Sequence, residues 1–160
     1  MIRPGERAVE YPSSVDASVV YIGRIHTPWR YRDDCPRQGK LDGPVCRIEI
    51  FEPWVGALTG IEAFSQLQVL YWLDRSRRDL VLQRPRRSEK SLGTFALRSP
   101  VRPNPIGLSL VDLVAVEGSS LLVRGLDCVD GTPLIDLKPD HCHHTPSSRP
   151  ADAGNETGQG

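Results

Sequence analysis

The sequence predicts a mainly β fold, a single small closed or nearly closed β-barrel with a short helix and long functional loops. Of its 160 residues, 39% are hydrophobic and 25% charged, which is the ordinary usage of one globular domain. Glycine and proline contribute 14 residues each, which favours many turns over long helices. About six short apolar segments lie between these turns, and closing them into a barrel removes exposed sheet edges.

The two ends of the chain lack the pattern of a packed core. Residues 1–16 are polar and rich in turn formers, so they are expected to form a flexible N-terminal arm. Hydrophobic periodicity stops after Pro139, and residues 140–160 are expected to form a disordered tail. The predicted barrel domain therefore spans residues 17–139.

Short segments rich in apolar and β-branched residues mark the strands. Residues 45–51 alternate, with Cys46, Ile48 and Ile50 on one face and charged residues on the other. Segments 108–116 and 121–126 flank Glu-Gly-Ser-Ser, the composition of a hairpin turn. The remaining strands are predicted at residues 19–25, 67–73, 93–97 and 134–137, with a short helix at 58–64.

The segment RSPVRPNPIG at residues 98–107 is predicted to be a rigid loop. Each proline fixes its own φ and pushes the preceding residue into an extended conformation. Arg102 and Asn104 both precede prolines, so their backbones are held extended before any ligand arrives. Composition alone favours a plain connection between two strands as much as a binding loop.

A second polar loop contains three carboxylates within ten residues, Asp127, Asp130 and Asp136. Its turn Asp-Gly-Thr-Pro is a common one and carries no function by itself. Carboxylates beside a rigid basic loop nevertheless favour a polar site.

Charge is unevenly distributed along a chain whose net charge is zero. Residues 75–102 hold nine basic side chains against two acidic ones, Asp79 and Glu89. Such a segment is typical of a phosphate-binding surface, although a solvated arginine-rich loop has the same composition.

Several classes of protein are disfavoured by the sequence. The four cysteines have no CxxC spacing and the N-terminus lacks a secretory pattern, so reduced thiols in the cytoplasm are expected. No apolar run approaches the roughly 18 residues that a membrane span needs. The string Asp-His-Cys-His-His at residues 140–144 has no second ligand pair at zinc spacing, so no metal site is expected.

The sequence contains, in this order and spacing, the segments CPRQ, GIEAFS, GTFALRSPVRPNPIGLSLVDL and LDCVDGTPLIDLKP. Together these segments resemble the TrmO/TsaA-like family of tRNA methyltransferases. The resemblance covers residues 21–139, about three quarters of the chain, and the RSPVRPNPIG and DGTP blocks together are highly specific. It implies a β-barrel enzyme that binds S-adenosyl-L-methionine and acts as a homodimer. It also implies methylation of N6 of threonylcarbamoyl-adenosine at tRNA position 37.

Carried over position by position, the resemblance implies that the cofactor contacts Pro36, Arg37, Gln38, Asp74, Arg75, Arg98, Leu108, Asp130, Gly131, Thr132 and Pro133. These residue types suit S-adenosyl-L-methionine. Arg37 and Arg98 are candidates for its carboxylate, and Asp130 for a ribose hydroxyl or the amine.

Catalysis of in-line methyl transfer consists mostly of alignment, and no covalent enzyme intermediate is needed. Asp130 and Asp136 are candidate acceptors for the proton that leaves the base nitrogen. Tyr71 and Trp72 are adjacent strand residues, so at most one of them can offer a face for base stacking. The candidate tRNA contacts are Arg77, Arg78, Arg86 and Arg87.

The sequence also departs from the family pattern. Gln66 stands where the family usually has His, Asp140 where it has Tyr, and Asp74-Arg75 where it often has His-Gln. These departures leave two alternatives open. One is a regulator of the same fold that binds S-adenosyl-L-methionine or tRNA without catalysis, and the other is a methyltransferase with a different substrate.

Overall fold

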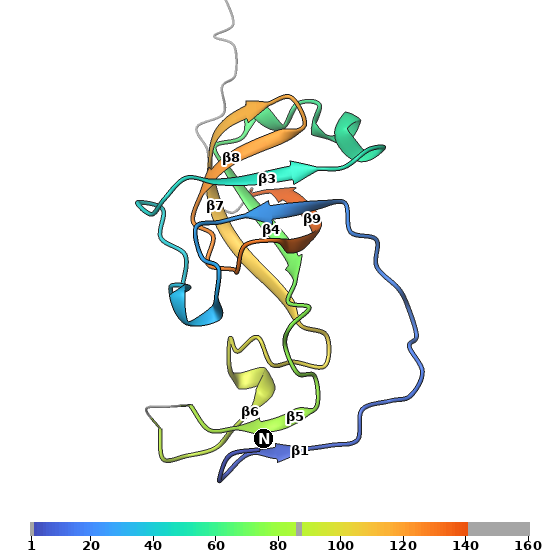
Figure 1. Ribbon diagram of the computed structural model, residues 1–160, viewed down its shortest axis with the longest axis vertical. Coiled ribbons are helices and arrows are strands. Elements are labelled where there is room, and N and C mark those ends of the chain that lie inside the picture. The colour runs from blue at the N-terminus through green and yellow to red at the C-terminus, as the bar shows by residue number, and fades with distance from the viewer. Residues whose placement is uncertain (1, 86–87, 141–160) are drawn as a thin grey trace, which may run out of the picture.

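In the part of the chain that the structure describes, nine strands form two separate sheets at opposite ends of an elongated molecule (Figure 1). The computed structural model describes residues 2–85 and 88–140. One end is a closed barrel with the strand order β2-β3-β8-β7-β4-β9, and every neighbouring pair is antiparallel. The predicted closed barrel is confirmed. Its strands are β2 (Gly23–His26), β3 (Cys46–Ile50), β4 (Gln66–Trp72), β7 (Ile106–Glu117), β8 (Ser120–Arg124) and β9 (Thr132–Pro139).

Alternating side chains fill the barrel with a continuous apolar core. In β3, Cys46, Ile48 and Ile50 are buried while Arg47 is exposed, as predicted. Every strand of the barrel contributes buried apolar residues or a buried glycine to its interior. The fully buried members of the core are Ile25, Ile48, Leu67, Val69, Val111, Leu121, Val123 and Leu134.

The second sheet is small and lies outside the barrel. Its strands are β1 (Arg7–Ala8), β5 (Leu80–Gln83) and β6 (Leu92–Gly93), in the order β1-β5-β6. Side-chain hydrogen bonds join this sheet to the loop that follows it. The amide of Gln83 donates to Thr94 Oγ1 (2.8 Å) and to the carbonyl of Val101 (2.8 Å). β1 comes from the segment expected to be an N-terminal arm.

Three predicted elements differ from those observed. The strand predicted at 93–97 is wrong, because Thr94–Ala96 form the 3-10 helix η4. The Thr94 hydroxyl donates to the carbonyl of Leu80 (2.6 Å). This side-chain hydrogen bond stabilises a turn where the apolar residues of the segment had predicted an extended strand. The helix predicted at 58–64 is divided into two 3-10 helices, η2 (Trp54–Leu58) and η3 (Ile61–Ala63), and the first barrel strand begins only at Gly23.

Within the described residues, none of the helices has the length and apolar composition that would let it cross a membrane.

Candidate functional site

A buried polar network lies inside one end of the barrel. The Tyr71 hydroxyl donates to Asp127 Oδ1 (2.8 Å) and lies 2.9 Å from Ser109 Oγ, which is itself 3.3 Å from the same carboxylate oxygen. Tyr71 and Ser109 are buried and Asp127 is half-buried. Burial, and then the neighbouring Asp127 carboxylate, raise the pKa of Tyr71, so the phenol remains a hydrogen-bond donor.

The other oxygen of the same carboxylate fixes a loop from elsewhere in the chain. Asp127 Oδ2 accepts a hydrogen bond from the backbone N–H of Gly39 (3.2 Å). Close approach is possible because Gly39 has no side chain: a Cβ there would lie 1.7 Å from the carbonyl oxygen of Gly125. Gly107 likewise packs on the Tyr71 ring, where a Cβ would lie 2.0 Å from Cε2.

This network brings together the segments that the sequence singled out. Gly39 follows the candidate positions Pro36–Gln38, and Ser109 follows Leu108. Tyr71 lies near the end of β4, three residues before Asp74, and Asp127 begins the loop that leads to Asp130–Pro133. Four segments that are distant in sequence are therefore fixed at one end of the barrel by the carboxylate of a single residue.

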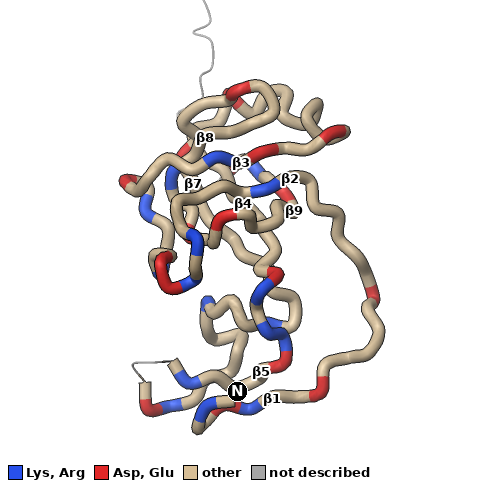
Figure 2. Tube along the Cα trace, viewed as in Figure 1, with Lys and Arg blue, Asp and Glu red and all other residues tan. Residues whose placement is uncertain are grey.

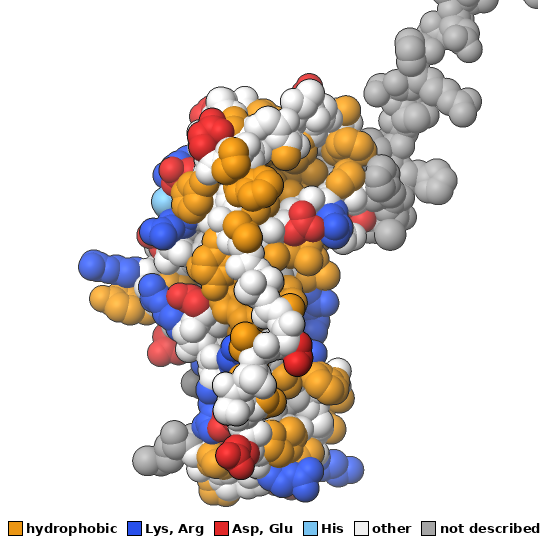
Figure 3. Space-filling model, turned by 90° about the vertical axis from the view of Figure 1, so that its right-hand side faces the viewer, with side chains coloured by type: hydrophobic (Ala, Val, Ile, Leu, Met, Phe, Trp, Pro, Cys, Tyr) orange, Lys and Arg blue, Asp and Glu red, His pale blue; other side chains and the backbone are white. Residues whose placement is uncertain are grey.

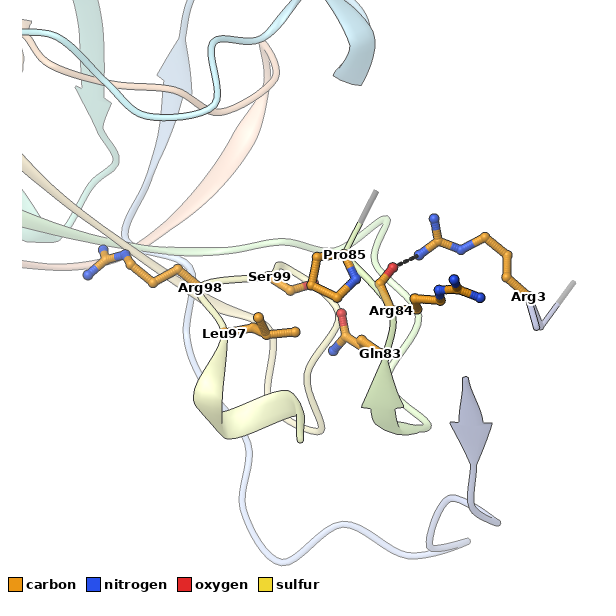
Figure 4. A pocket seen from close by; sticks show the side chains of 7 residues that line it. All are labelled: Arg3, Gln83, Arg84, Pro85, Leu97, Arg98 and Ser99. Carbon is orange, nitrogen blue, oxygen red and sulfur yellow. Dashed lines mark hydrogen bonds between the residues drawn. The ribbon is translucent and has the colours of Figure 1, made fainter. Parts of the chain in front are cut away.

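Arg98 joins the same end from the loop below the barrel. Its Nη2 donates to the carbonyl of Leu108 (3.2 Å), which links two predicted cofactor positions directly. Leu97, Arg98 and Ser99 also border a pocket of about 210 Å³ between this loop and the end of β5. In Figure 4 the guanidinium of Arg98 points away from that pocket and away from Arg84. Arg98 therefore presents its charge towards the barrel.

Asp130 lies two residues before β9, in a turn anchored to β2. Its Oδ1 accepts a hydrogen bond from the backbone N–H of Thr27 (3.1 Å) and lies 3.7 Å from His26 Nδ1. The other ring nitrogen of His26 is 2.8 Å from Glu49 Oε2. The hydrogen bond from His26, aided by Arg47, holds the pKa of Glu49 below its ordinary value. The Asp130 side chain is 50% exposed, so it can accept a hydrogen bond from a ligand.

Asp136 does not belong to this cluster. It lies within β9, four residues beyond Thr132 where the strand begins, so about 13 Å of extended strand separate it from the turn that holds Asp130. Its carboxylate forms an ion pair with Lys138 (2.7 Å) and borders an apolar groove of about 450 Å³ beside η2 and η3. The structure thus places the two candidate proton acceptors in different surroundings.

The cysteines near the candidate site are not activated nucleophiles. Burial raises the pKa of Cys128 to about 12, and burial followed by Asp127 raises the pKa of Cys35. Thiolates are therefore scarce at neutral pH, and the chemistry available here is binding and alignment by arginines, carboxylates and backbone groups.

Two of the four arginines predicted to contact tRNA are described, and both have structural partners. Arg77 forms two hydrogen bonds with the carboxylate of Asp79, both 2.8 Å long. Arg78 donates to the carbonyl of Pro103 (2.6 Å) and lies over the ring of Tyr11, 4.4 Å from its centroid. Arg86 and Arg87 lie outside the described residues. Lys and Arg positions nevertheless gather around the small sheet and its junction with the barrel (Figures 2 and 3).

Two of the departures from the family pattern, Gln66 and Asp140, have structural roles. The Gln66 amide donates to Asp112 Oδ1 (2.8 Å), and Asp140 is 4% exposed and accepts a hydrogen bond from Gln68 (3.1 Å). Tyr71, considered as a stacking residue, is buried in the core, while Trp72 has the guanidinium of Arg78 5.3 Å from its ring centroid. Within the described residues no group of three or more metal-ligating side chains gathers, and residues 141–144 are not described.

Sequence reasoning placed Asp127 in an acidic cluster but gave it no function of its own. Its partners Tyr71 and Ser109 lie 56 and 18 residues away in sequence, so no local pattern connects the three. The glycines at positions 39 and 107 were the available signal, because glycines next to rigid loops often mark a close approach of two segments.

A closed antiparallel barrel whose polar loops converge at one end defines a small β-barrel domain with a site at its mouth. A family model described as the tRNA-methyltransferase O N-terminal domain matches residues 24–144, and the chain belongs to this family.

Similar proteins agree with this assignment. A probable S-adenosyl-L-methionine-binding protein VirR of Rhizobium radiobacter is 55% identical over 139 residues, which are 87% of this chain and 79% of that protein. A tRNA (adenine(37)-N6)-methyltransferase of Escherichia coli is 37% identical over 129 residues, 74% of this chain and 55% of that protein. The crystal structure of TrmO from Pseudomonas aeruginosa superposes with a TM-score of 0.64 at 31% identity and covers 91% of this chain. The chain spans 64% of that crystallised chain.

Proposed function

We propose that this chain is an S-adenosyl-L-methionine-dependent methyltransferase that acts on N6 of adenine at tRNA position 37, with threonylcarbamoyl-adenosine as its substrate base. The observation that carries the proposal is the network of Tyr71, Ser109 and Asp127, because it gathers the implied cofactor segments at one end of the barrel. The names of the relatives in Rhizobium radiobacter and Escherichia coli support both the cofactor and the reaction.

The residues at this end fit the cofactor chemically. Arg98 is exposed, and its guanidinium retains N–H groups beyond the one bonded to Leu108, so it can bind a carboxylate through charge-assisted hydrogen bonds. The half-exposed carboxylate of Asp130 can accept from a hydroxyl or an ammonium group. Pro36 to Gln38 and Gly131 to Pro133 supply backbone carbonyl and N–H groups. When bound, S-adenosyl-L-methionine supplies the methyl group.

Asp130 is the proposed acceptor of the proton that leaves N6 as the methyl group is transferred. Acylation of the amine by a carbamoyl group makes that proton more acidic, so a surface carboxylate is a sufficient base. The Thr27 N–H holds Asp130 in place, and His26 Nδ1 lies 3.7 Å from its carboxylate. Asp136 lies further along β9 and is paired with Lys138, so it is not proposed as the base.

We further propose that the protein is a cytoplasmic homodimer. Exposed apolar side chains follow the outer face of β7, where Ile106 is 43%, Leu108 45% and Val114 50% exposed. A run of this kind on a sheet surface favours burial against another chain. Because Leu108 belongs to it, the partner chain would cover the edge of the cofactor site. The proposal would be ruled out if light scattering showed a stable monomer and that monomer were fully active.

The proposed tRNA surface consists of the exposed cations around the small sheet. Arg77 is paired with Asp79 and Arg78 with the carbonyl of Pro103, so the exposed Arg75 and Lys90 carry more of the phosphate contacts. Binding should weaken steeply as salt rises, since each phosphate contact releases counterions.

The test is to incubate the protein with methyl-labelled S-adenosyl-L-methionine and total tRNA, digest the tRNA and identify the labelled nucleoside. The proposal expects N6-methylated threonylcarbamoyl-adenosine. Label in another nucleoside would identify a different substrate, and no transfer despite tight cofactor binding would indicate a regulator.

A non-catalytic binding protein is the second candidate. Gln66 and Asp140 replace family residues with side chains that are bonded within the barrel, and the chain spans only about half the length of the Escherichia coli enzyme. Cofactor binding without methyl transfer to any tRNA would favour this candidate.

A further inference from the structure

Phe95 is the most exposed large hydrophobic side chain in the described part of the molecule. Its side chain is 80% exposed, compared with 63% for Tyr31 and 42% for Trp54. Transfer of a phenyl ring out of water is favourable, and the ring has no polar atom that could form a hydrogen bond with solvent. Packing in the barrel core therefore does not account for a ring that is this exposed to solvent.

The backbone that carries Phe95 is firmly held. Thr94, the preceding residue, is 4% exposed, and its hydroxyl donates to Leu80 while accepting from the amide of Gln83. On the other side, Arg102 Nη1 donates to the carbonyl of Leu97 (2.6 Å) and lies 3.4 Å from that of Ser99. Because both flanks are fixed by side chains, the ring is presented at little further entropic cost.

One face of the Phe95 ring has a cation beside it. The guanidinium carbon of Arg102 lies 5.8 Å from the ring centroid, within the range of a cation–π contact. With 80% of the side chain exposed, the opposite face remains open. An arginine-backed aromatic ring with one open face is the kind of surface on which unpaired nucleobases stack.

We propose that Phe95 is a stacking residue for an unpaired base of single-stranded RNA, next to the base that enters the cofactor site. This rests on the proposed function, because Arg98 of that site is only three residues away, at most about 10 Å along the chain. The local charge favours RNA over a second copy of this chain, since the loop carries Arg98 and Arg102 and no acidic residue. Tyr31, which also has an arginine near its ring, is followed by Asp33 and Asp34, which would repel phosphates.

The experiment measures equilibrium binding of a synthetic tRNA anticodon stem-loop to the full chain. Phe95→Ala and Phe95→Leu should both weaken binding about tenfold, because neither retains an aromatic face, whereas Phe95→Trp should bind like the parent. Leucine keeps most of the apolar bulk, so it separates stacking from general hydrophobic contact. Leu92→Ala removes another exposed apolar side chain of the small sheet and serves as the matched control.

A second arm changes the RNA. In a set of stem-loops, each RNA lacks one base of the loop. One of these RNAs should bind the parent protein weakly, and Phe95→Ala should not lower the affinity for that RNA any further. Affinity of Phe95→Leu equal to that of the parent would overturn the proposal, as would absence of RNA binding by the parent. If Phe95→Ala dissociates a dimer while Phe95→Leu preserves both the dimer and RNA binding, the ring contacts a second copy instead. Cofactor binding by calorimetry should be unchanged in all variants, which keeps this test separate from that of the proposed function.

Discussion

The barrel and the small sheet are stabilised by different forces. The barrel contains a closed ladder of antiparallel strands around fully buried apolar residues such as Ile48 and Leu121. In the small sheet, β1 and β6 have only two residues each, and Leu80 and Gln83 supply the buried positions of β5. The Gln83 amide and the Thr94 hydroxyl, together with arginine contacts, replace an extensive apolar core.

This difference separates stability from recognition. A closed barrel gives a rigid mouth on which a cofactor site can be built with fixed geometry. A small sheet held by side-chain hydrogen bonds can present charged and aromatic groups to a partner without contributing much to the global free energy of unfolding. Substitutions in the two regions should therefore change different measurements.

The largest expected effect is on stability, from the barrel core. Leu121→Ala should lower the free energy of unfolding by about 2 to 5 kcal/mol, because it leaves a cavity in a close-packed interior. Leu92→Ala on the small sheet should change it by less than about 0.5 kcal/mol. Urea unfolding monitored by circular dichroism measures both, and equal losses would show that the sheets are not distinct in stability.

The next effect concerns the carboxylate that joins the cofactor segments. Asp127→Ala removes the acceptor of the Tyr71 hydroxyl and of the Gly39 N–H, so the free energy of unfolding should fall by about 1 to 3 kcal/mol. The affinity for S-adenosyl-L-methionine should fall at least about tenfold, because the loop at Pro36–Gln38 loses its anchor. Tyr71→Phe keeps the Gly39 contact and should have a smaller effect on affinity. Calorimetric titration would contradict this account if both variants bound like the parent.

A smaller and local effect is expected in the small sheet. Thr94→Val keeps the side-chain shape but loses bonds to Leu80 and Gln83, at a cost of about 1 kcal/mol each before relaxation. Amide hydrogen exchange should accelerate in β5 and η4 but not in the barrel strands. Faster exchange throughout the barrel would mean that the two regions unfold as one unit.

The smallest effect is a pH dependence near the barrel surface. The pKa of Glu49 is lowered in the folded protein, chiefly by its hydrogen bond with His26. A lowered pKa contributes stability that is present above the carboxyl's unfolded value and is lost as the pH falls through the folded value. An NMR titration should show the Glu49 carboxyl pKa rising towards its ordinary value in His26→Ala. An unchanged pKa would mean that Arg47 or Arg24 sets it instead.

Much of the barrel could be predicted from sequence, because alternating burial leaves a period of two, as at residues 46–50. The segment at 93–97 misled because its apolar residues Phe95 and Ala96 are both exposed, while the Thr94 hydroxyl bonds to Leu80 and the chain turns into η4. The two-residue strand β1 is too short to leave a pattern.

The candidate site was predictable only in part. The resemblance supplied the loops at residues 36–38, 98 and 130–133, but it did not show that Asp127 holds them together. That role depends on contacts across the closed barrel, which no local spacing encodes. The separation of Asp130 from Asp136 was hidden for the same reason, since the seven residues from 130 to 136 can be a compact turn or an extended strand.

The most direct test of the central claim, that the end of the barrel around Asp127 binds S-adenosyl-L-methionine, is calorimetric titration of Arg98→Ala beside the parent. Arg47→Ala serves as the control, because it also removes an exposed arginine from the protein but on the outer face of β3. We expect the parent and Arg47→Ala to bind alike and a folded Arg98→Ala to bind at least about tenfold more weakly, as loss of a charge-assisted contact predicts. Equal affinity in all three proteins would contradict the account.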